Sequence, residues 1–255
     1  MFTLVGFAET IDPAGVDVNL TALADQHVTT TGDDLTIPAL NQIVALAAGV
    51  ASGGTAKARL DIPSLLRVTR VYVSPINGYA DADATPEIVP NVMDYRQNPL
   101  VLRPSEIAQA VINSDTTAAA LQWLLMWLAD GPIRPVTGEM FTNRFTGTTT
   151  LVVDVWTNGT ITPDDRLPAG RYAVVGMRAI SAGIVAARLV FPGEQGYRPG
   201  VLGALLDDNH DWPGFRFGGM GIFGEFEHNQ IPSVEYLSSV ADTAEEVYLD
   251  LIKVR

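Results

Sequence analysis

The amino-acid sequence predicts an all-β protein, and three observations lead to that class. The 23 glycines and 16 prolines are scattered along the 255 residues and divide the chain into short segments, which is typical of strands joined by turns. The segments between these breaks are rich in β-branched residues or alternate between apolar and polar residues. The two halves of the chain also match each other at a nearly constant offset, which indicates one β unit used twice.

Five segments have the composition of strands. Each is short and carries apolar, mostly β-branched or aromatic, residues at most positions. These segments are residues 68–73, 151–156, 171–175, 185–191 and 247–254.

The internal match is clearest between residues 52–63 and 181–192. These two segments share Ser, Gly, Ala, Arg, Leu and Pro at an offset of 129 residues. Three further pairs keep the same order at offsets of 131, 128 and 127, and a pair near the N-terminus fits at 139 with a gap. The further pairs are Asp33-Asp34 with Asp164-Asp165, Pro104-Ser105 with Pro232-Ser233, Asp115-Thr116 with Asp242-Thr243, and residues 1–3 with 140–142.

The duplication divides the chain at a connection that contains Pro and Gly. We expect a first domain at residues 1–131, a linker at 132–138 and a second domain at 139–255. Each half is then about 120–130 residues of short strands, which suits one eight-stranded sandwich of the jelly-roll kind. The predicted fold is therefore two tandem eight-stranded jelly rolls with a few short helices.

The repeated strand has different faces in the two halves. In residues 56–62, small or apolar residues alternate with three charged residues, which predicts one core face and one solvent face. In the second copy the three charged positions are Ala186, Arg188 and Val190, so two of the charges are lost. We expect this face of the second unit to be covered by a neighbour.

Residues 115–130 are ambiguous between helix and strand. Good helix formers follow the N-cap candidate Asp115, so local propensity favours a helix. The duplication aligns residues 120–128 with residues 247–255, which are strand-like. We therefore predict a closing strand at 120–128 that is buried on both faces, preceded by a short helix at about residues 105–113.

The charge of the chain argues against binding to nucleic acid. It has 16 basic and 29 acidic side chains, a formal net charge of −13 at pH 7, and only two lysines, Lys57 and Lys253. No run of basic residues forms a stripe that could follow a phosphate backbone. Cysteine is absent, which excludes disulfides, thiolate metal sites and cysteine nucleophiles.

The low content of charged residues predicts association between copies. Charged residues make up 18% of the chain, against about 25% in typical soluble domains. A monomer with so few charges would expose much apolar area, and Arg, which greatly outnumbers Lys here, is favoured at interfaces. Base composition or a halophilic habitat is the alternative explanation of this skew.

We expect neither an export signal nor a membrane-spanning segment in this sequence. The N-terminal segment lacks a basic n-region, which a secretory signal needs. The longest apolar run, residues 118–129, is shorter than the ~20 residues of a membrane-spanning helix.

Motifs for cofactors and metals are weak. Residues 219–224 spell GxGxxG, but no helical segment or βαβ unit surrounds them, so we interpret them as a glycine-rich bend at a sheet edge. The best metal candidate is an acidic cluster that also fits a solvated turn. Its members are Asp207, Asp208, Asn209, His210 and Asp211. No GxSxG elbow, Walker loop, HExxH or kinase signature occurs, so we predict no enzyme activity, no catalytic residue, no cofactor and no small-molecule substrate.

Several segments together resemble the major capsid proteins of double jelly-roll viruses, a lineage of tailless icosahedral viruses that includes bacteriophages. The likeness is strongest at residues 138–200 and extends into the first half at 32–38 and 58–60. The segments of the second half that carry it are 138–141, 151–156, 167–176, 187–189, 198–200 and 215–218.

The resemblance implies a structural protein of the virion. In that family a homotrimer forms a pseudo-hexameric tile of an icosahedral capsid shell, often around an internal lipid membrane. The implied partners are other copies of the chain, other capsid proteins such as pentons, and that membrane, with synthesis in the host cytoplasm. A length of 255 residues makes this a compact member and puts long exterior loops in doubt.

The alternative is a jelly-roll carbohydrate-binding protein or glycoside hydrolase. A hydrolase needs two acidic side chains about 5–10 Å apart in a cleft, and 29 acidic residues offer many pairs. Trp212, beside His210 and Asp211, is the local hint of a sugar-binding surface. Burial of this tryptophan at a subunit contact would explain it equally well.

Overall fold

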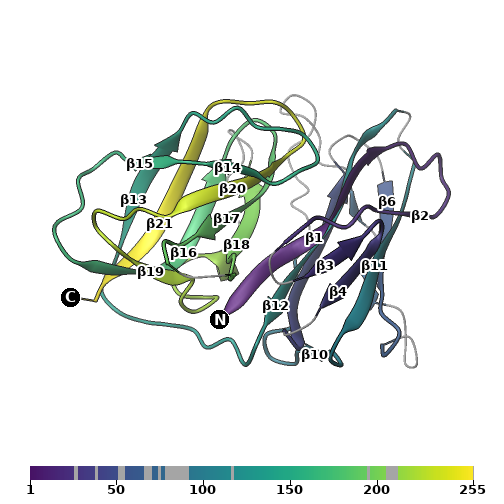
Figure 1. Cartoon of the computed structure of the whole chain (residues 1–255), viewed down its shortest axis with the longest axis horizontal. Helices are drawn as coiled ribbons and strands as arrows, with labels where there is room; N and C mark the ends of the chain where they lie inside the picture. Colours follow the sequence, from purple (N-terminus) through teal and green to yellow (C-terminus); the bar gives the residue numbers. More distant parts are fainter. Residues whose placement is uncertain are drawn as a thin grey trace. The chain divides into compact units, whose positions relative to one another are not determined.

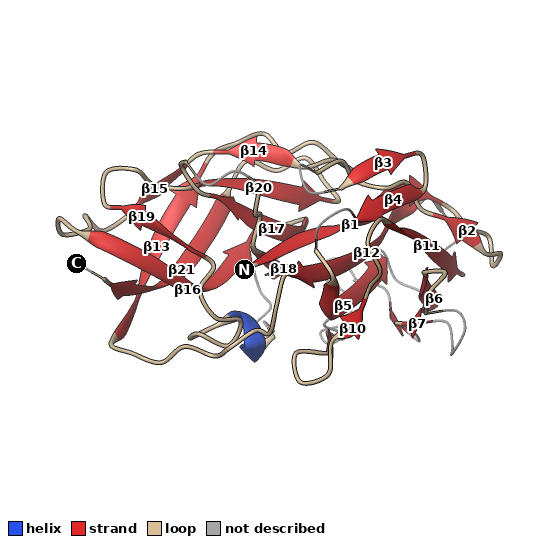
Figure 2. Cartoon of the chain, turned by 60° about the horizontal axis from the view of Figure 1, so that its bottom comes forward, coloured by secondary structure: helices blue, strands red, loops and turns tan. Residues whose placement is uncertain are grey.

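The computed structural model describes residues 1–25, 28–37, 40–50, 55–65, 71–73, 76–77, 92–115, 118–193, 196–204 and 212–254. Regular structure in this part of the chain is β, apart from one turn of 3-10 helix at Pro213–Phe215, which is blue in Figure 2. None of the described helical structure is long and apolar enough to cross a membrane. The predicted all-β class is confirmed.

The chain forms two compact units (Figure 1). The N-terminal unit is Leu4–Pro132, and the C-terminal unit is Ile133–Arg255 together with Met1–Thr3. The domain limits expected from the sequence, 1–131 and 139–255 around a linker at 132–138, stay a prediction about where independently folding domains end.

Two sheets make up the N-terminal unit. The first has the order β1-β12-β5-β10, with β9 also paired to β5. Its strands are β1 (Phe2–Ile11), β5 (Gln42–Val50), β9 (Met93–Asp94), β10 (Leu100–Val101) and β12 (Ala120–Ala129). The second has the order β3-β4-β11-β6-β7, with β2 on β11 and β8 on β6. Its strands are β2 (Val18–Asn19), β3 (Thr29–Thr31), β4 (Asp34–Ile37), β6 (Thr55–Asp61), β7 (Val71–Tyr72), β8 (Ile76–Asn77) and β11 (Glu106–Ser114).

The strands of the C-terminal unit are linked in the order β14-β20-β17-β18-β16-β21-β13-β15, with β19 on β16. A short parallel pairing between β16 and β18 joins the two halves of this arrangement. The strands are β13 (Met140–Gly147), β14 (Thr157–Gly159), β15 (Ile161–Pro163), β16 (Arg171–Ile180), β17 (Ile184–Val190), β18 (Gly200–Ala204), β19 (Gly224–Glu227), β20 (Ser233–Ser238) and β21 (Glu245–Lys253).

Both units have the strand order of a jelly roll. One half of each unit pairs the first strand with the last, as β1-β12-β5-β10 and as β13-β21-β16-β19. The other half is β4-β11-β6-β7 in one unit and β14-β20-β17-β18 in the other. Arg59 on β6 and Arg188 on β17 therefore occupy equivalent strands. The predicted fold class, two jelly rolls in tandem, is confirmed.

Strand β12 confirms the predicted closing strand. It lies between β1 and β5, follows β5 antiparallel with one bulge after Trp127, and is buried at residues 121–129. Sheet partners on both edges and packing on both faces outweigh helix propensity here. Gly49 of β5 leaves room for the indole, because a Cβ there would lie 2.4 Å from Trp123.

The predicted helix at residues 105–113 is wrong, because this segment is strand β11. Its Ala, Gln and Ile residues have some helix propensity, but the strand pairs with β6 from Gln109 opposite Asp61 onward. Its other edge pairs with β2 and β4. Hydrogen bonds along both edges outweigh helix preferences of less than about 1 kcal/mol per residue.

The predicted strand at residues 151–156 is also wrong. The segment is a connection with one isolated bridge, between Val153 and Ser238. Asp154 has a φ of 68°, a left-handed conformation that breaks the extended backbone. The apolar residues of this segment instead cover part of the C-terminal jelly roll, as the next section describes.

Candidate functional site

The acidic cluster singled out in the sequence, Asp207 to Asp211, lies outside the described residues. Its described neighbour Trp212 packs edge-on against Phe215, with ring centroids 4.8 Å apart. Over the described ranges, no group of three or more His, Asp or Glu side chains is placed to hold a metal ion.

The GxGxxG segment, residues 219–224, is a turn that leads into strand β19, not into a helix. The glycines around it have a structural role. A Cβ on Gly218 (φ +81°) would lie 2.0 Å from the Val136 carbonyl oxygen, and one on Gly221 (φ +76°) would lie 3.0 Å from that of Arg134. The Val136 N–H donates to the Gly218 carbonyl at 3.0 Å. The glycine turn therefore holds the connection at the start of the C-terminal unit against the jelly roll.

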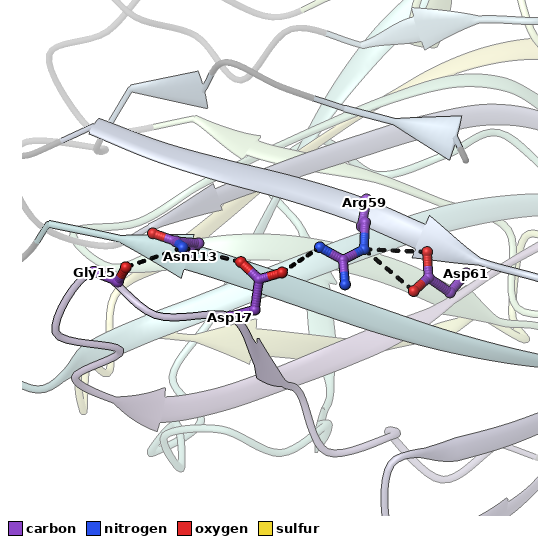
Figure 3. A network of polar contacts seen from close by, with 5 residues as sticks. All are labelled: Gly15, Asp17, Arg59, Asp61 and Asn113. Carbon is purple, nitrogen blue, oxygen red and sulfur yellow. Dashed lines mark hydrogen bonds and ion pairs between the residues drawn. The ribbon is translucent and has the colours of Figure 1, made fainter. Parts of the chain in front are cut away.

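A polar network on β6 and β11 ties together the second sheet of the N-terminal unit (Figure 3). Arg59 donates from Nη1 to Asp17 at 2.5 Å and from Nε to both oxygens of Asp61 at 3.2 Å. Asn113 donates to Asp17 at 3.0 Å and to the Gly15 carbonyl at 3.1 Å. The guanidinium thus bridges its own strand to the connection before β2.

This network lies on an open face. The Arg59 side chain is 17% exposed and that of Asp17 is 52% exposed, and Tyr72, opposite Arg59 on β7, is exposed. The hydrogen bond from Arg59 to Asp17 raises the pKa of the guanidinium further above neutral. Arg59 therefore stays charged and links the strand to the preceding connection, and solvent weakens its attraction to the two carboxylates.

The equivalent arginine of the C-terminal unit, Arg188, is buried. Its Nε donates to Glu235, its direct partner on β20, at 2.6 Å. Its guanidinium carbon lies 4.0 Å from the centre of the Trp156 ring, a cation–π geometry that removes the arginine from water. Arg198 approaches the same carboxylate at 3.9 Å. The connection at 151–156 therefore provides the cover over β17.

The expectation that another molecule covers this face needs correction at two positions. Ala186 and Arg188 are 0% and 3% exposed in the single chain, so a second copy is not required to bury them. Val190, the third residue of this face, stays half-buried.

A third network surrounds Asp250 of β21, which is 0% exposed. Arg216 donates to its two oxygens at 2.8 and 2.9 Å, Thr142 donates at 2.7 Å, and the Phe217 N–H donates at 3.0 Å. Burial alone would raise the pKa of Asp250, but these hydrogen bonds lower it below the ordinary value. The carboxylate thereby holds Phe217 at a φ of 51° with its ring 61% exposed.

A fourth group is buried inside the C-terminal jelly roll. Glu245 accepts a hydrogen bond from the Thr149 N–H at 3.1 Å, and its other oxygen and the Tyr236 hydroxyl have no hydrogen-bond partner. Burial raises the pKa of both side chains.

Sequence reasoning found the two arginines through the repeat, but it missed their partners and the buried carboxylates of Glu245 and Asp250. The burial of Glu245 can be predicted from its position in the strand, because Val247, Leu249 and Leu251 follow it on the same face. An acidic residue in register with three core residues predicts a buried carboxyl group. Asp250 has no such signal, because solvent-facing positions of strands commonly hold acidic residues.

Comparisons with known proteins give likenesses at the level of structure. No family model matches the chain, and no curated protein matches its sequence. The chain is similar to the major capsid protein P2 from bacteriophage PM2, with 10% identity over 100% of this chain and 98% of that chain, at a TM-score of 0.28. It is also similar to a Paenibacillus xanthan lyase, with 12% identity over 100% of this chain and 25% of that chain, at a TM-score of 0.21. Because both TM-scores are low, neither likeness assigns a function.

Proposed function

We propose that this chain is a major capsid protein, whose homotrimers tile an icosahedral viral shell. The observation that carries the proposal is the repetition of one jelly-roll strand order within a single chain. Three copies of such a chain can place six equivalent jelly rolls around a threefold axis, which makes a pseudo-hexameric tile from a trimer. The sequence resemblance described above is to proteins of this kind.

Apolar side chains that the single chain leaves exposed support association between copies. Single exposed apolar residues are common on any protein, so the proposal requires that trimer contacts bury several of them together. An obligate interface of this kind buries about 2,000 Å² or more. The exposed residues are Met1, Val16, Tyr72, Val101, Ile107, Phe141, Val152, Val155, Phe217, Ile222, Val240 and Val254.

The proposal extends to partners and location. The chain would be made in the host cytoplasm and assemble into the virion shell with further copies, with penton proteins and, in shells that enclose one, with a lipid membrane. A net charge of −13 disfavours direct contact with the genome. The proposed role needs no catalytic residue, cofactor or small-molecule substrate.

The local hint for the carbohydrate-binding alternative is a tryptophan that could stack on a sugar ring. All four tryptophans lie in described residues and each packs against protein: Trp123 and Trp127 in the core, Trp156 on Arg188, and Trp212 on Phe215. This arrangement does not favour the alternative.

Two measurements on the purified chain test the proposal. Light scattering should give a stable trimer, and electron microscopy should show hexagonal tiles or shells. A well-behaved monomer of 27.3 kDa at micromolar concentration would contradict the proposal. Hydrolysis of a polysaccharide that is lost in Asp208→Ala or Asp211→Ala would favour the glycoside hydrolase instead.

A further inference from the structure

Glu245 and Tyr236 meet inside the C-terminal jelly roll. Glu245, the first residue of β21, is 1% exposed, and Tyr236 of β20 is 0% exposed. Both lie against Gly147 of β13, where a Cβ would be 2.8 Å from Glu245 Oε2 and 3.4 Å from the Tyr236 hydroxyl. The strands β20 and β21 belong to different halves of the unit, so this contact spans the interior between them.

The surroundings of Glu245 do little to stabilise a negative charge. Glu245 accepts a hydrogen bond from the Thr149 N–H at 3.1 Å, and no basic side chain among the described residues forms an ion pair with it. A buried carboxylate without a cationic partner is strongly unfavourable, and the group responds by keeping its proton.

Among the described residues, the charged group that faces Glu245 is another carboxylate, Asp242, on the connection between β20 and β21. Burial raises the pKa of Glu245, and the negative charge of Asp242 raises it further, against the opposing effect of the Thr149 hydrogen bond. The groups that face Glu245 from the packed elements are Tyr236 on β20, Asp242 on residues 239–244, Thr149 on residues 148–156, and Gly147 on β13.

Asp242 keeps its own charge by a different arrangement. The Ser181 hydroxyl donates to it, and so do the N–H groups of Ala182 at 3.1 Å and Thr243 at 2.7 Å. Burial alone would raise the pKa of Asp242, but these hydrogen bonds lower it below the ordinary value. The pKa values of two neighbouring carboxyl groups are therefore shifted in opposite directions.

We propose that Glu245 is a proton-dependent latch of the C-terminal jelly roll. In the folded protein its side chain holds a proton at mildly acidic pH, and loss of that proton weakens the packing of β13, β20 and β21. The affected end of the unit is where residues 148–156 meet residues 239–244, through hydrogen bonds such as the Leu151 N–H to the Asp242 carbonyl at 3.0 Å. Acid keeps this end closed, and a rise in pH loosens it.

The pH window follows from linkage. Between the ordinary glutamate pKa of 4.5 and the raised pKa in the folded state, the native protein binds one more proton at Glu245 than the unfolded chain does. Stability therefore falls as the pH rises through this window and levels off above it. Asp242 acts in a separate window, because its lowered pKa changes stability only below its ordinary value of 3.8.

The test compares thermal melting of the intact chain and of Glu245→Gln from about pH 5 to about pH 8. Glutamine keeps the shape and supplies an N–H without a titrating group. The melting temperature of the original protein should fall by several degrees across this range relative to Glu245→Gln, whose profile should be flatter. Parallel profiles would overturn the proposal.

Two controls keep the result specific. Glu246→Gln removes a carboxylate from the half-buried neighbour that binds Tyr248 and Arg144, and it should leave the pH dependence in place. Infrared spectroscopy of the original protein supplies a readout that needs no stable variant: a protonated-carboxyl band should persist at a pH above the ordinary glutamate range and disappear on further alkalinisation. Absence of that band at mildly acidic pH would equally overturn the proposal.

Discussion

The two jelly rolls share one strand order, but the chain covers different faces of them. In the N-terminal unit, β5 and β12 are buried on both faces, whereas the sheet that carries Arg59 presents exposed or half-buried side chains to solvent. In the C-terminal unit, β17 is buried at nearly every residue, whereas β13 alternates between buried and exposed positions. The two units share a strand order, and the side chains of each face decide whether that face is exposed to solvent or covered.

The equivalent arginines show this at one position. Arg59 is held by two aspartates on an open face, and Arg188 by one glutamate under an indole ring. Equivalent arginines therefore form solvent-accessible ion pairs in one unit and a buried ion pair in the other. The predictions below compare buried residues with more exposed ones.

Trp127→Ala should produce the largest loss of stability. The indole is 0% exposed in β12, and truncation of a buried tryptophan costs about 3–5 kcal/mol. Ile252→Ala, in the equivalent closing strand β21 at a half-buried position, should cost clearly less. Urea unfolding of both variants measures the difference. If Trp127→Ala is insoluble, Trp127→Phe replaces it, and a loss no greater than that of Ile252→Ala would show that the two closing strands are energetically alike.

Arg188→Ala should cost about 3 kcal/mol, because it removes the buried cation at 2.6 Å from Glu235, leaves only the more distant Arg198 at 3.9 Å, and uncovers Trp156. Adding Glu235→Ala should recover part of the loss, since the carboxylate that lost its nearer cation is removed as well. Guanidinium-induced unfolding of the single and double variants tests this. A double variant no more stable than Arg188→Ala would mean that packing under the indole, and not charge, holds this face.

Asp250→Asn should cost about 2 kcal/mol, because charge-assisted hydrogen bonds to Arg216 are replaced by weaker ones. The lowered pKa of Asp250 makes its contribution complete above the ordinary value of 3.8 and lost as the pH falls through the folded-state pKa. Melting curves at decreasing pH should therefore be less steep for Asp250→Asn than for the original protein. Asp164→Asn, which removes an exposed surface ion pair of Arg144, should behave like the original protein.

The sequence predicted the fold correctly for segments whose counterpart in the other half is recognisably a strand. Residues 120–128 were assigned correctly because their counterpart in the second half is plainly strand-like, even though their own propensity favours helix. The predicted helix at 105–113 is wrong because it rests on local propensity, although the pair Pro104-Ser105 with Pro232-Ser233 aligns this segment with strand β20. A propensity of a few tenths of a kcal/mol per residue decides little once both edges of a strand are paired.

The networks were less predictable than the fold. The repeat marked Arg59 and Arg188 but not Trp156, because a left-handed residue at Asp154 turns an apparent strand into the connection that covers Arg188. The metal candidate at Asp207 to Asp211 stays a prediction, since it lies outside the described residues. Which acidic residue pairs with which arginine depends on turns and connections that hydrophobic periodicity does not record.

Arg59→Ala should produce the smallest effect, a loss of about 1 kcal/mol or less. Asp17, whose side chain is 52% exposed, stays solvated when the guanidinium is removed, whereas that of Asp61 is 19% exposed. An ion pair with a solvent-exposed partner contributes little. A double-mutant cycle with Asp17→Ala should give a coupling energy below about 1 kcal/mol that shrinks with added salt. The matching cycle of Arg188 with Glu235 should give a larger coupling that salt changes little, since the indole and the sheet exclude the ions. Equal couplings in the two cycles would mean that the cover over β17 does not change the strength of the ion pair, and the contrast between the two jelly rolls would then be one of geometry alone.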